Sequence, residues 1–174
     1  KAPSKARPLT DRAKEALFNI LRERVFDCDF LDLFAGSGAV GIEALSRDGH
    51  RAVFVEQNRE AVRVIEYNLQ LTGLKAAATV HPVDAVRGLN LLARQGAQFD
   101  LVFVGAPYDD PALEEVLVVL GSGHYLKPAG LVIAEHRRQH LLPAQFGRLK
   151  AGREARYGET VLTFYEESNL SGEL

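Results

Sequence analysis

Acidic side chains stand at the ends of three apolar runs, where they could hold the polar groups of a bound nucleotide. Asp32 and Glu56 lie near the ends of the first two runs, and Asp84 follows the third. Between the first two acids, Gly36-Ser37-Gly38-Ala39-Val40-Gly41 matches the pattern G-x-G-x-x-G. A glycine turn between a strand and a helix lets the backbone approach a cofactor, and an acid about twenty residues later accepts from ribose hydroxyls. Taken alone, this pattern is the dinucleotide fingerprint.

The charge of Asp32 favours S-adenosylmethionine over a dinucleotide. A carboxylate repels a diphosphate and attracts a cation. S-adenosylmethionine carries an ammonium and a sulfonium and no phosphate. A dinucleotide-dependent dehydrogenase would also need a further half-sheet or a substrate domain, for which this sequence leaves no residues. Because a buried carboxylate without a partner is costly, we expect Asp32 to hold the cofactor's amino group, directly or through water. Phe34, Gly36 and Gly38 belong to the same expected cofactor site, the glycines by letting the backbone come close.

The adenosine end of the cofactor is assigned to the second and third acids. Glu56 would accept from both ribose hydroxyls. Asp84 would hold the adenine amine, with Ala85 supplying a backbone donor. Each acid has a simpler alternative: Asp84 could merely cap the helix that follows it, and Glu56 could be a solvated strand end.

The second chemical motif is a Pro-Tyr corner, Gly105-Ala106-Pro107-Tyr108. In enzymes that methylate amino groups, this corner usually reads Asp/Asn-Pro-Pro-Tyr/Phe, and its first side chain holds the target amine. Gly105 has no side chain, and Ala106 lacks the ring that stiffens the corner, although its carbonyl remains. Losing one positioned electrostatic group costs on the order of 10²–10³ in rate. We therefore expect normal cofactor binding and slow or absent methylation.

Two nearby acids are weaker candidates for the missing group. Asp109 and Asp110 stand at the start of the next expected helix, where an acid more readily caps the helix than reaches a substrate. We expect the double change Gly105→Asp with Ala106→Pro to raise single-turnover transfer by at least about tenfold.

The order of elements predicts the sheet that positions these groups. Short β-rich runs alternate with helical segments, which indicates a parallel sheet covered on both faces. The expected helices are an early one capped by Thr10 and then 39–48, 58–72, 84–95 and 110–120, with stops at Gly49, Gly73 and Gly121. The last two strands predict an antiparallel hairpin, which needs only a short connection. The expected strands are 29–34, 51–56, 77–81, 99–104, 129–135, 160–166 and a weaker one near 147–151.

Length and composition favour one ordinary globular unit. We expect a single domain over residues 1–174, with an N-terminal basic segment and helix in 1–28 and the catalytic sheet in 29–174. The single cysteine, Cys28, excludes an internal disulfide and multi-cysteine zinc sites and favours a cytoplasmic protein. No apolar run approaches the length of a membrane span, so we expect no membrane partner. We also expect no metal, because the chain has one cysteine and its histidines are scattered, apart from the pair His136 and His140, which has no nearby carboxylate support.

Positive charge gathers in two segments although the net charge is −2. Residues 1–24 hold seven Lys and Arg against three acids, and residues 136–156 hold six against one. Such segments could form a nucleic-acid footprint or could simply be solvated faces and loops.

Four stretches together resemble the RsmD family of bacterial methyltransferases, which modify the exocyclic N2 of a guanine in 16S ribosomal RNA. The opening Arg-Pro-x-Thr-Asp-Arg joined to Phe-Ala-Gly-Ser-Gly is the specific part, since many methyltransferases share the glycine motif alone. The resemblance runs from Arg7 to about Glu166, and Tyr157-Gly158 is also similar. The four stretches are residues 7–12, 15–19, 31–38 and 43–47.

This resemblance implies a Rossmann-like class I S-adenosylmethionine-dependent methyltransferase fold, with a seven-stranded, mostly parallel sheet and a terminal antiparallel hairpin. It implies 16S ribosomal RNA as partner, presented on a 30S assembly particle; a monomer is our default. Thr10 and Asp11 would lie near the methionine end of the cofactor. Tyr108 would stack on the target guanine, because chemistry on a base requires taking it out of its stack. The sequence departs from the family at Gly105-Ala106. We also expect the basic segment that the family carries ahead of Lys1 to be missing or truncated here.

Two alternatives stay open. A DNA amino-methyltransferase acting on adenine N6 or cytosine N4 shares the Pro-Tyr corner, but its target-recognition domain does not fit in this chain. A non-catalytic homologue could keep the cofactor fold as an RNA-binding or assembly module.

Overall fold

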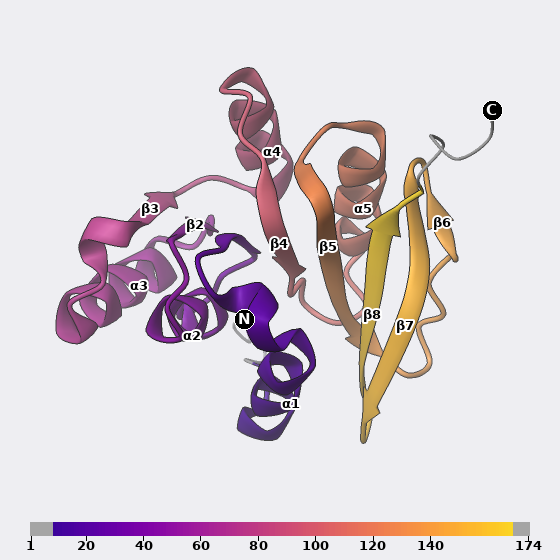
Figure 1. Ribbon diagram of the computed structural model, residues 1–174, viewed down its shortest axis with the longest axis horizontal. Coiled ribbons are helices and arrows are strands. Elements are labelled where there is room, and N and C mark those ends of the chain that lie inside the picture. Colours follow the sequence, from indigo (N-terminus) through magenta and orange to yellow (C-terminus); the bar gives the residue numbers. More distant parts are fainter. Residues whose placement is uncertain (1–8, 169–174) are drawn as a thin grey trace, which may run out of the picture.

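The computed structural model describes residues 9–168, which form one mixed sheet with helices on both faces (Figure 1). The strands have the order β3-β2-β1-β4-β5-β8-β7-β6 across the sheet. Their bounds are β1 (Asp29–Leu33), β2 (Arg51–Val55), β3 (Ala78–His81), β4 (Phe99–Val104), β5 (Leu126–Arg137), β6 (Gln145–Phe146), β7 (Leu149–Tyr157) and β8 (Thr160–Glu167). The helices are α1 (Asp11–Leu21), α2 (Ala39–Ser46), α3 (Arg59–Thr72), α4 (Ala85–Arg94) and α5 (Ala112–Ser122), with 3-10 turns η1 (Arg22–Val25) and η2 (Lys75–Ala77).

The first five strands are parallel, as expected. β1 pairs with β2 on one side and with β4 on the other, so the strand order reverses beside β1. Ligands of open α/β sheets bind at the carboxyl ends of strands at such a switch point. The glycine turn leaves β1 at this point, and the Gly105 corner leaves β4 beside it.

The expected antiparallel hairpin is confirmed, because β8 pairs antiparallel with both β5 and β7. The described sheet has eight strands rather than seven. The additional strand is the two-residue β6, which pairs with β7 across a turn at Gly147, where φ is +56°. The strand expected near 147–151 therefore starts two residues later and extends to Tyr157.

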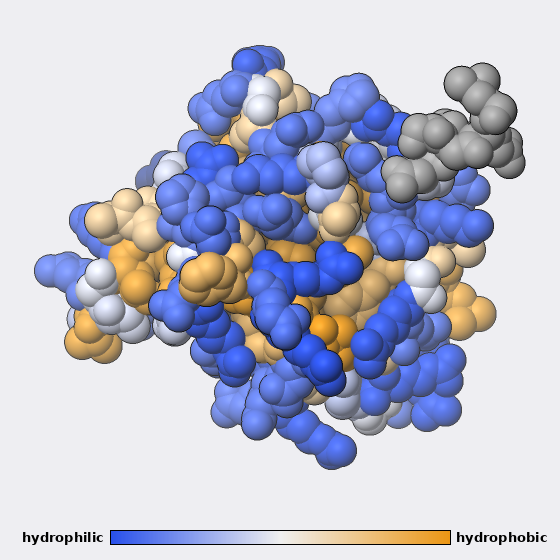
Figure 2. Space-filling view, in the orientation of Figure 1, coloured by the Kyte–Doolittle hydropathy of each residue, from blue (hydrophilic) through white to orange (hydrophobic). Residues whose placement is uncertain are grey.

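Two apolar clusters fill the space on either side of the sheet. α4 and α5 cover one face, packing on side chains such as Leu33 and Val104. α1, α2 and α3 cover the other, packing on Phe54, Phe103 and Ile133. Figure 2 shows apolar surface between hydrophilic side chains on the side of the molecule that carries α1.

Capping signals place most helix ends. The Thr10 hydroxyl accepts from the Ala13 amide at 3.2 Å, and Gly73 ends α3 at φ +72°. Gly121 was predicted to stop a helix, and this is wrong, because α5 continues to Ser122. Its lack of a side chain serves packing instead: a Cβ there would lie 2.0 Å from the carbonyl oxygen of Phe146.

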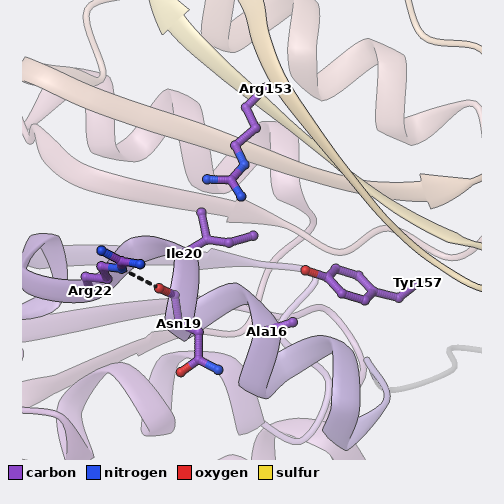
Figure 3. A pocket seen from close by; sticks show the side chains of 6 residues that line it. All are labelled: Ala16, Asn19, Ile20, Arg22, Arg153 and Tyr157. Atoms are coloured by element: carbon purple, nitrogen blue, oxygen red, sulfur yellow. Dashed lines mark hydrogen bonds between the residues drawn. The ribbon is translucent and has the colours of Figure 1, made fainter.

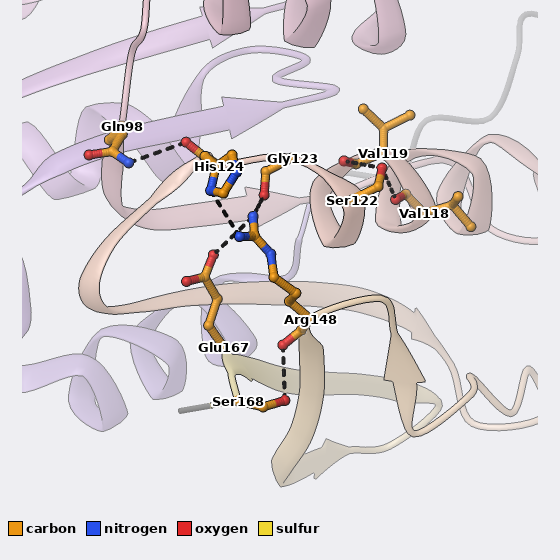
Figure 4. Close-up of polar contacts among 9 residues, drawn as sticks. All are labelled: Gln98, Val118, Val119, Ser122, Gly123, His124, Arg148, Glu167 and Ser168. Carbon is orange, nitrogen blue, oxygen red and sulfur yellow. Dashed lines mark hydrogen bonds and ion pairs between the residues drawn. The ribbon is translucent and has the colours of Figure 1, made fainter. Parts of the chain in front are cut away.

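Arg148 joins the end of α5 to the terminal hairpin (Figure 4). Its guanidinium donates to the Gly123 carbonyl, lies 2.8 Å from His124 Nδ1 and approaches Glu167 at 4.0 Å. This arginine of the second basic segment thus has partners within the protein.

Cys28 is buried where η1 leads into β1, in the same apolar cluster as α1. Burial, assisted by the nearby carboxylates Asp100 and Asp29, raises the pKa of its thiol to about 12. In the part of the chain that the structure describes, no helix is long and apolar enough to cross a bilayer.

Candidate active site

Two adjoining cavities lie at the carboxyl ends of the parallel strands. The larger has a volume of about 840 Å³ and the smaller about 340 Å³. Phe34, Gly36 and Gly105 line both, so the cavities meet between the glycine turn and the Pro-Tyr corner. The sequence therefore located the strand ends around which this site is built.

Glu56 lines the larger cavity and also holds the glycine turn. One carboxylate oxygen accepts from the Gly36 amide at 2.9 Å, and the other accepts from the Asn58 amide at 2.8 Å. Gly36 has a φ of +57°, a conformation that suits glycine. Glu56 is therefore not merely a solvated strand end. Each carboxylate oxygen has a second lone pair with which it can accept from a ligand.

Asp32 lines the smaller cavity and is almost completely buried. Its Oδ2 accepts from the Gly41 amide at 3.0 Å. Burial raises the pKa of this carboxyl to about 8, the Gly41 hydrogen bond opposes the rise, and the charge of Glu56 adds to it. A cationic ligand group in the smaller cavity would stabilise the ionised form.

Asp84 and Ala85 line the larger cavity at the start of α4. Asp84 does cap this helix, since its Oδ1 accepts from the Arg87 amide at 3.0 Å. Asp84 both caps α4 and lines the larger cavity. Its capping bond therefore does not exclude the expected contact with the adenine amine.

Some expected site residues do not line either cavity. Leu9 lines the smaller cavity, whereas its neighbours Thr10 and Asp11 do not. Gly38 lies at the start of α2 with a φ of +80°. Ala106 is buried in the cluster under α4 and α5, and Tyr108 is not among the residues that line the two cavities. Direct roles for these residues in cofactor binding or catalysis stay predictions.

The Pro-Tyr corner forms the wall at the end of β4. Gly105 donates to the Leu33 carbonyl at 3.2 Å, and Pro107 lines the larger cavity. A Cβ on Gly105 would lie 2.9 Å from Cε1 of the Phe103 ring. The ring therefore takes up the space in which a side chain at position 105 would begin.

Tyr108 is held in place by β8 and β5. Its hydroxyl lies 2.8 Å from Thr160 Oγ1, and the Arg137 guanidinium lies over its ring at 5.4 Å. Asp109 pairs with Arg137 at 3.6 Å. Asp110 accepts from the Ala112 amide at 2.9 Å, in the capping role expected of it. Both acids therefore have structural partners, and Asp110 also lines the larger cavity.

A further acid belongs to the smaller cavity and was not predicted from the sequence. Glu135 is only 4% exposed and lines this cavity with Asp32 and Gly105. Its Oε2 has no hydrogen-bond partner among the described residues. An acidic residue at the end of an apolar run was the pattern that pointed to Asp32. Glu135 has the same pattern, since it follows Leu131-Val132-Ile133-Ala134.

A third hollow, of about 560 Å³, lies between α1 and β7 (Figure 3). Arg22 lines it from the first basic segment, and Arg153 lines it from the second, together with Tyr157. Folding therefore brings the two basic segments together at one groove. Among the described residues, no cluster of three or more His, Cys, Asp and Glu side chains could hold a metal ion.

Comparisons with known proteins find relatives that match most of the chain. The model of the family described as "Conserved hypothetical protein 95" matches residues 1–166. "Putative rRNA methyltransferase YlbH" of Bacillus subtilis is 35% identical over 95% of this chain and 90% of its own length. "Ribosomal RNA small subunit methyltransferase D" of Escherichia coli is 32% identical over 92% of this chain and 79% of its own.

A solved structure shares the whole architecture. "Putative methyltransferase yhhF from Escherichia coli" superposes with a TM-score of 0.81 at 32% identity, covering 95% of this chain and 90% of that one. The mostly parallel sheet with its antiparallel end is thus shared with a protein of closely similar length.

Proposed function

Since this chain belongs to the RsmD family of ribosomal RNA small subunit methyltransferases, we propose that it methylates the exocyclic N2 of a guanine in small-subunit ribosomal RNA. The observation that supports this most directly is the pair of joined cavities. Asp32 and Glu135 line the smaller one, Glu56 and Asp84 line the larger one, and Gly105 of the Pro-Tyr corner lies in the wall that both share. We further propose that the protein acts as a cytoplasmic monomer on a 30S assembly particle.

The residues present fit S-adenosylmethionine, which supplies an electrophilic methyl group when bound. The buried Asp32 suits the positive charges of the methionine end. Glu56 and Asp84, both in the larger cavity, suit ribose hydroxyls and the adenine amine. A diphosphate would meet these carboxylates unfavourably.

On the substrate side, the chain must bind a base taken out of its stack. Tyr108 presents an aromatic ring fixed by Thr160 and covered on one side by Arg137. We assign this ring to stacking on the guanine. Gly105 contributes a backbone close to the cavity and no acceptor side chain. The rate therefore depends on whether another group accepts the amine hydrogens.

Transfer of a labelled methyl group tests the function. Small-subunit particles and free small-subunit RNA from cells lacking their own enzyme of this family are compared with duplex DNA. We expect label in RNA, recovered as N2-methylguanosine after digestion. Label only in DNA would support the DNA amino-methyltransferase. Calorimetric cofactor binding without transfer to any substrate would support the non-catalytic homologue, and absence of binding would contradict every enzymatic version.

A further inference from the structure

Glu135 is a buried carboxylate, one oxygen of which has no hydrogen-bond partner among the described residues. The other buried carboxylate of the smaller cavity, Asp32, accepts from the backbone amide of Gly41. Oε2 of Glu135 has no such donor, although its residue is only 4% exposed. Leaving a buried acceptor unsatisfied destabilises the folded protein, and more so when the group is charged. A group kept at that cost in a cavity wall indicates a ligand.

The register of the sheet places Glu135 beside Gly105. β4 and β5 are parallel, with Phe103 paired to Ile133 and Val104 paired to Ala134. Positions 105 and 135 follow directly after this last pair, Gly105 just beyond the end of β4 and Glu135 still within β5. Since Phe103 and Ile133 pack toward α1, α2 and α3, the alternation of a strand directs positions 105 and 135 to that same face. Both residues line the smaller cavity there.

The Phe103 ring occupies the space beside Gly105, and Glu135 lines the same cavity. The Phe103 ring comes within 2.9 Å of where a Cβ at position 105 would stand. The Glu135 carboxylate comes from the adjacent strand. A carboxylate at the neighbouring position can do what an acidic side chain at position 105 would do, namely accept an N–H and take up positive charge.

We propose that Glu135 is the catalytic acceptor for the target amine, in place of the side chain that Gly105 lacks. This inference rests on the proposed function. As the N2 lone pair forms the bond to the methyl carbon, the pair of the breaking C–S bond stays on sulfur, and an N–H proton passes to the carboxylate of Glu135. No further reactant is needed, and the carboxyl later releases the proton to water.

The ionisation of Glu135 suits this task. Burial raises the pKa of its carboxyl to about 7, and a catalytic base works best with a pKa near the operating pH. The other titratable side chain in the wall of the smaller cavity is Asp32. His136, the next residue, is bonded to Thr163 at 2.7 Å and to the Arg137 carbonyl at 3.0 Å. Beyond it, Arg137 faces Tyr108 and Asp109.

Four variants test the proposal: Glu135→Ala, Glu135→Gln, the double change Gly105→Asp with Ala106→Pro, and the control Glu66→Gln on the exposed surface of α3. Single-turnover transfer to small-subunit particles is measured between pH 5.5 and 8.5. Cofactor affinity is measured by calorimetry, and folding by thermal melting.

We expect Glu135→Ala to lower the transfer rate by about 10²–10³ while cofactor affinity changes less than about twofold. Glu135→Gln keeps an acceptor oxygen but cannot take the proton. Its rate should fall less, and it should lack the rise through about pH 7 that we expect of the parent. The control should match the parent in rate, affinity and melting.

Each other result gives a distinct answer. An unchanged rate in Glu135→Ala, or a large loss of cofactor affinity, would overturn the proposal, the latter by assigning the carboxylate to the cofactor. If the parent shows no methyl transfer and the Gly105→Asp, Ala106→Pro variant does, the proposal for Glu135 is overturned while the proposed function stands. If neither transfers to RNA although both bind the cofactor, the proposed function itself fails.

Discussion

Glu56 links the backbone of the glycine turn to the expected ribose site. The carboxylate has partners within the protein as well as the proposed ligand, because the Gly36 and Asn58 amides both donate to it. Glu56→Ala should therefore weaken cofactor binding by about 1–3 kcal/mol and also lower the free energy of unfolding by a similar amount. Calorimetry and urea unfolding measure the two effects. Glu66→Ala is the exposed control on α3, and unchanged affinity in Glu56→Ala would show that the ribose site lies elsewhere.

Asp32 should make the stability of the free protein fall as pH rises. Its pKa is raised from 3.8 to about 8, so between these values the folded state holds a proton that the unfolded state has lost. This contribution is fully present below about pH 4 and is lost by about pH 8, at a slope of at most about 1.4 kcal/mol per pH unit. Asp32→Asn keeps an oxygen for the Gly41 amide and removes the titration. Urea unfolding should show that the free energy of unfolding of the variant, relative to that of the parent, is greater at pH 8.5 than at pH 5. The same difference in free energy at both pH values would contradict the raised pKa.

Single residues differ in how far the sequence reveals them. Asp32, Glu56 and Asp84 could be found because an acid after an apolar run has few reasons to be there. Glu135 carries the same signal, but the basic residues after it resemble a solvated strand end. The approach of Phe103 to Gly105 depends on strand alternation and on a ring orientation, and neither can be obtained from residue spacing.

At the scale of elements, α5 depends on a close approach to the β6 turn. Cβ atoms on Gly121 and Gly147 would lie 2.0 Å and 2.4 Å from carbonyl oxygens of Phe146 and Gly121, respectively. Gly121→Ala removes helix-breaking freedom and would stabilise an isolated helix. Here it forces two backbones apart, so we expect a loss of about 1–3 kcal/mol in the free energy of unfolding. Gly152→Ala, with nothing closer than 3.9 Å, is the control; equal unfolding midpoints would show that the contact yields easily.

The same contact explains which parts of the fold the sequence predicts. Alternating strands and helices, Thr10 and Gly73 as helix ends, and the terminal hairpin follow from local patterns. The two-residue β6 and the continuation of α5 through Gly121 arise from tertiary packing. Local propensity cannot reveal them. The division at residue 28 stays a prediction.

At the scale of the whole molecule, folding decides which basic residues can meet RNA. Arg148 is engaged by Gly123, His124 and Glu167, and Arg137 by Tyr108 and Asp109. The Arg138 side chain is exposed. We therefore expect Arg138→Ala to reduce the log-log salt slope of RNA binding by about one, and Arg137→Ala with Arg138→Ala by about one to two.

Filter binding from 50 to about 300 mM salt measures these slopes. Arg94→Ala changes the same charge at the end of α4, which packs on the face of the sheet away from α1, and should leave the slope unchanged. A slope that responds equally to Arg94 and Arg138 would indicate general charge attraction rather than a footprint around the Pro-Tyr corner.

The rate at which a reagent modifies the buried Cys28 thiol can report how often the structure around it opens. With a pKa of about 12, only about one Cys28 thiol in ten thousand is ionised at pH 8, and thiolate is the form that reacts. Modification by a thiol reagent should therefore require α1 and η1 to leave the sheet, and its rate reports how often they do. Because α1 follows Leu9 in the wall of the smaller cavity, S-adenosylmethionine at a hundred times its dissociation constant should slow the reaction by up to about a hundredfold. An unaltered rate would show that this helix opens independently of the cofactor, which would remove Thr10 and Asp11 from the binding site.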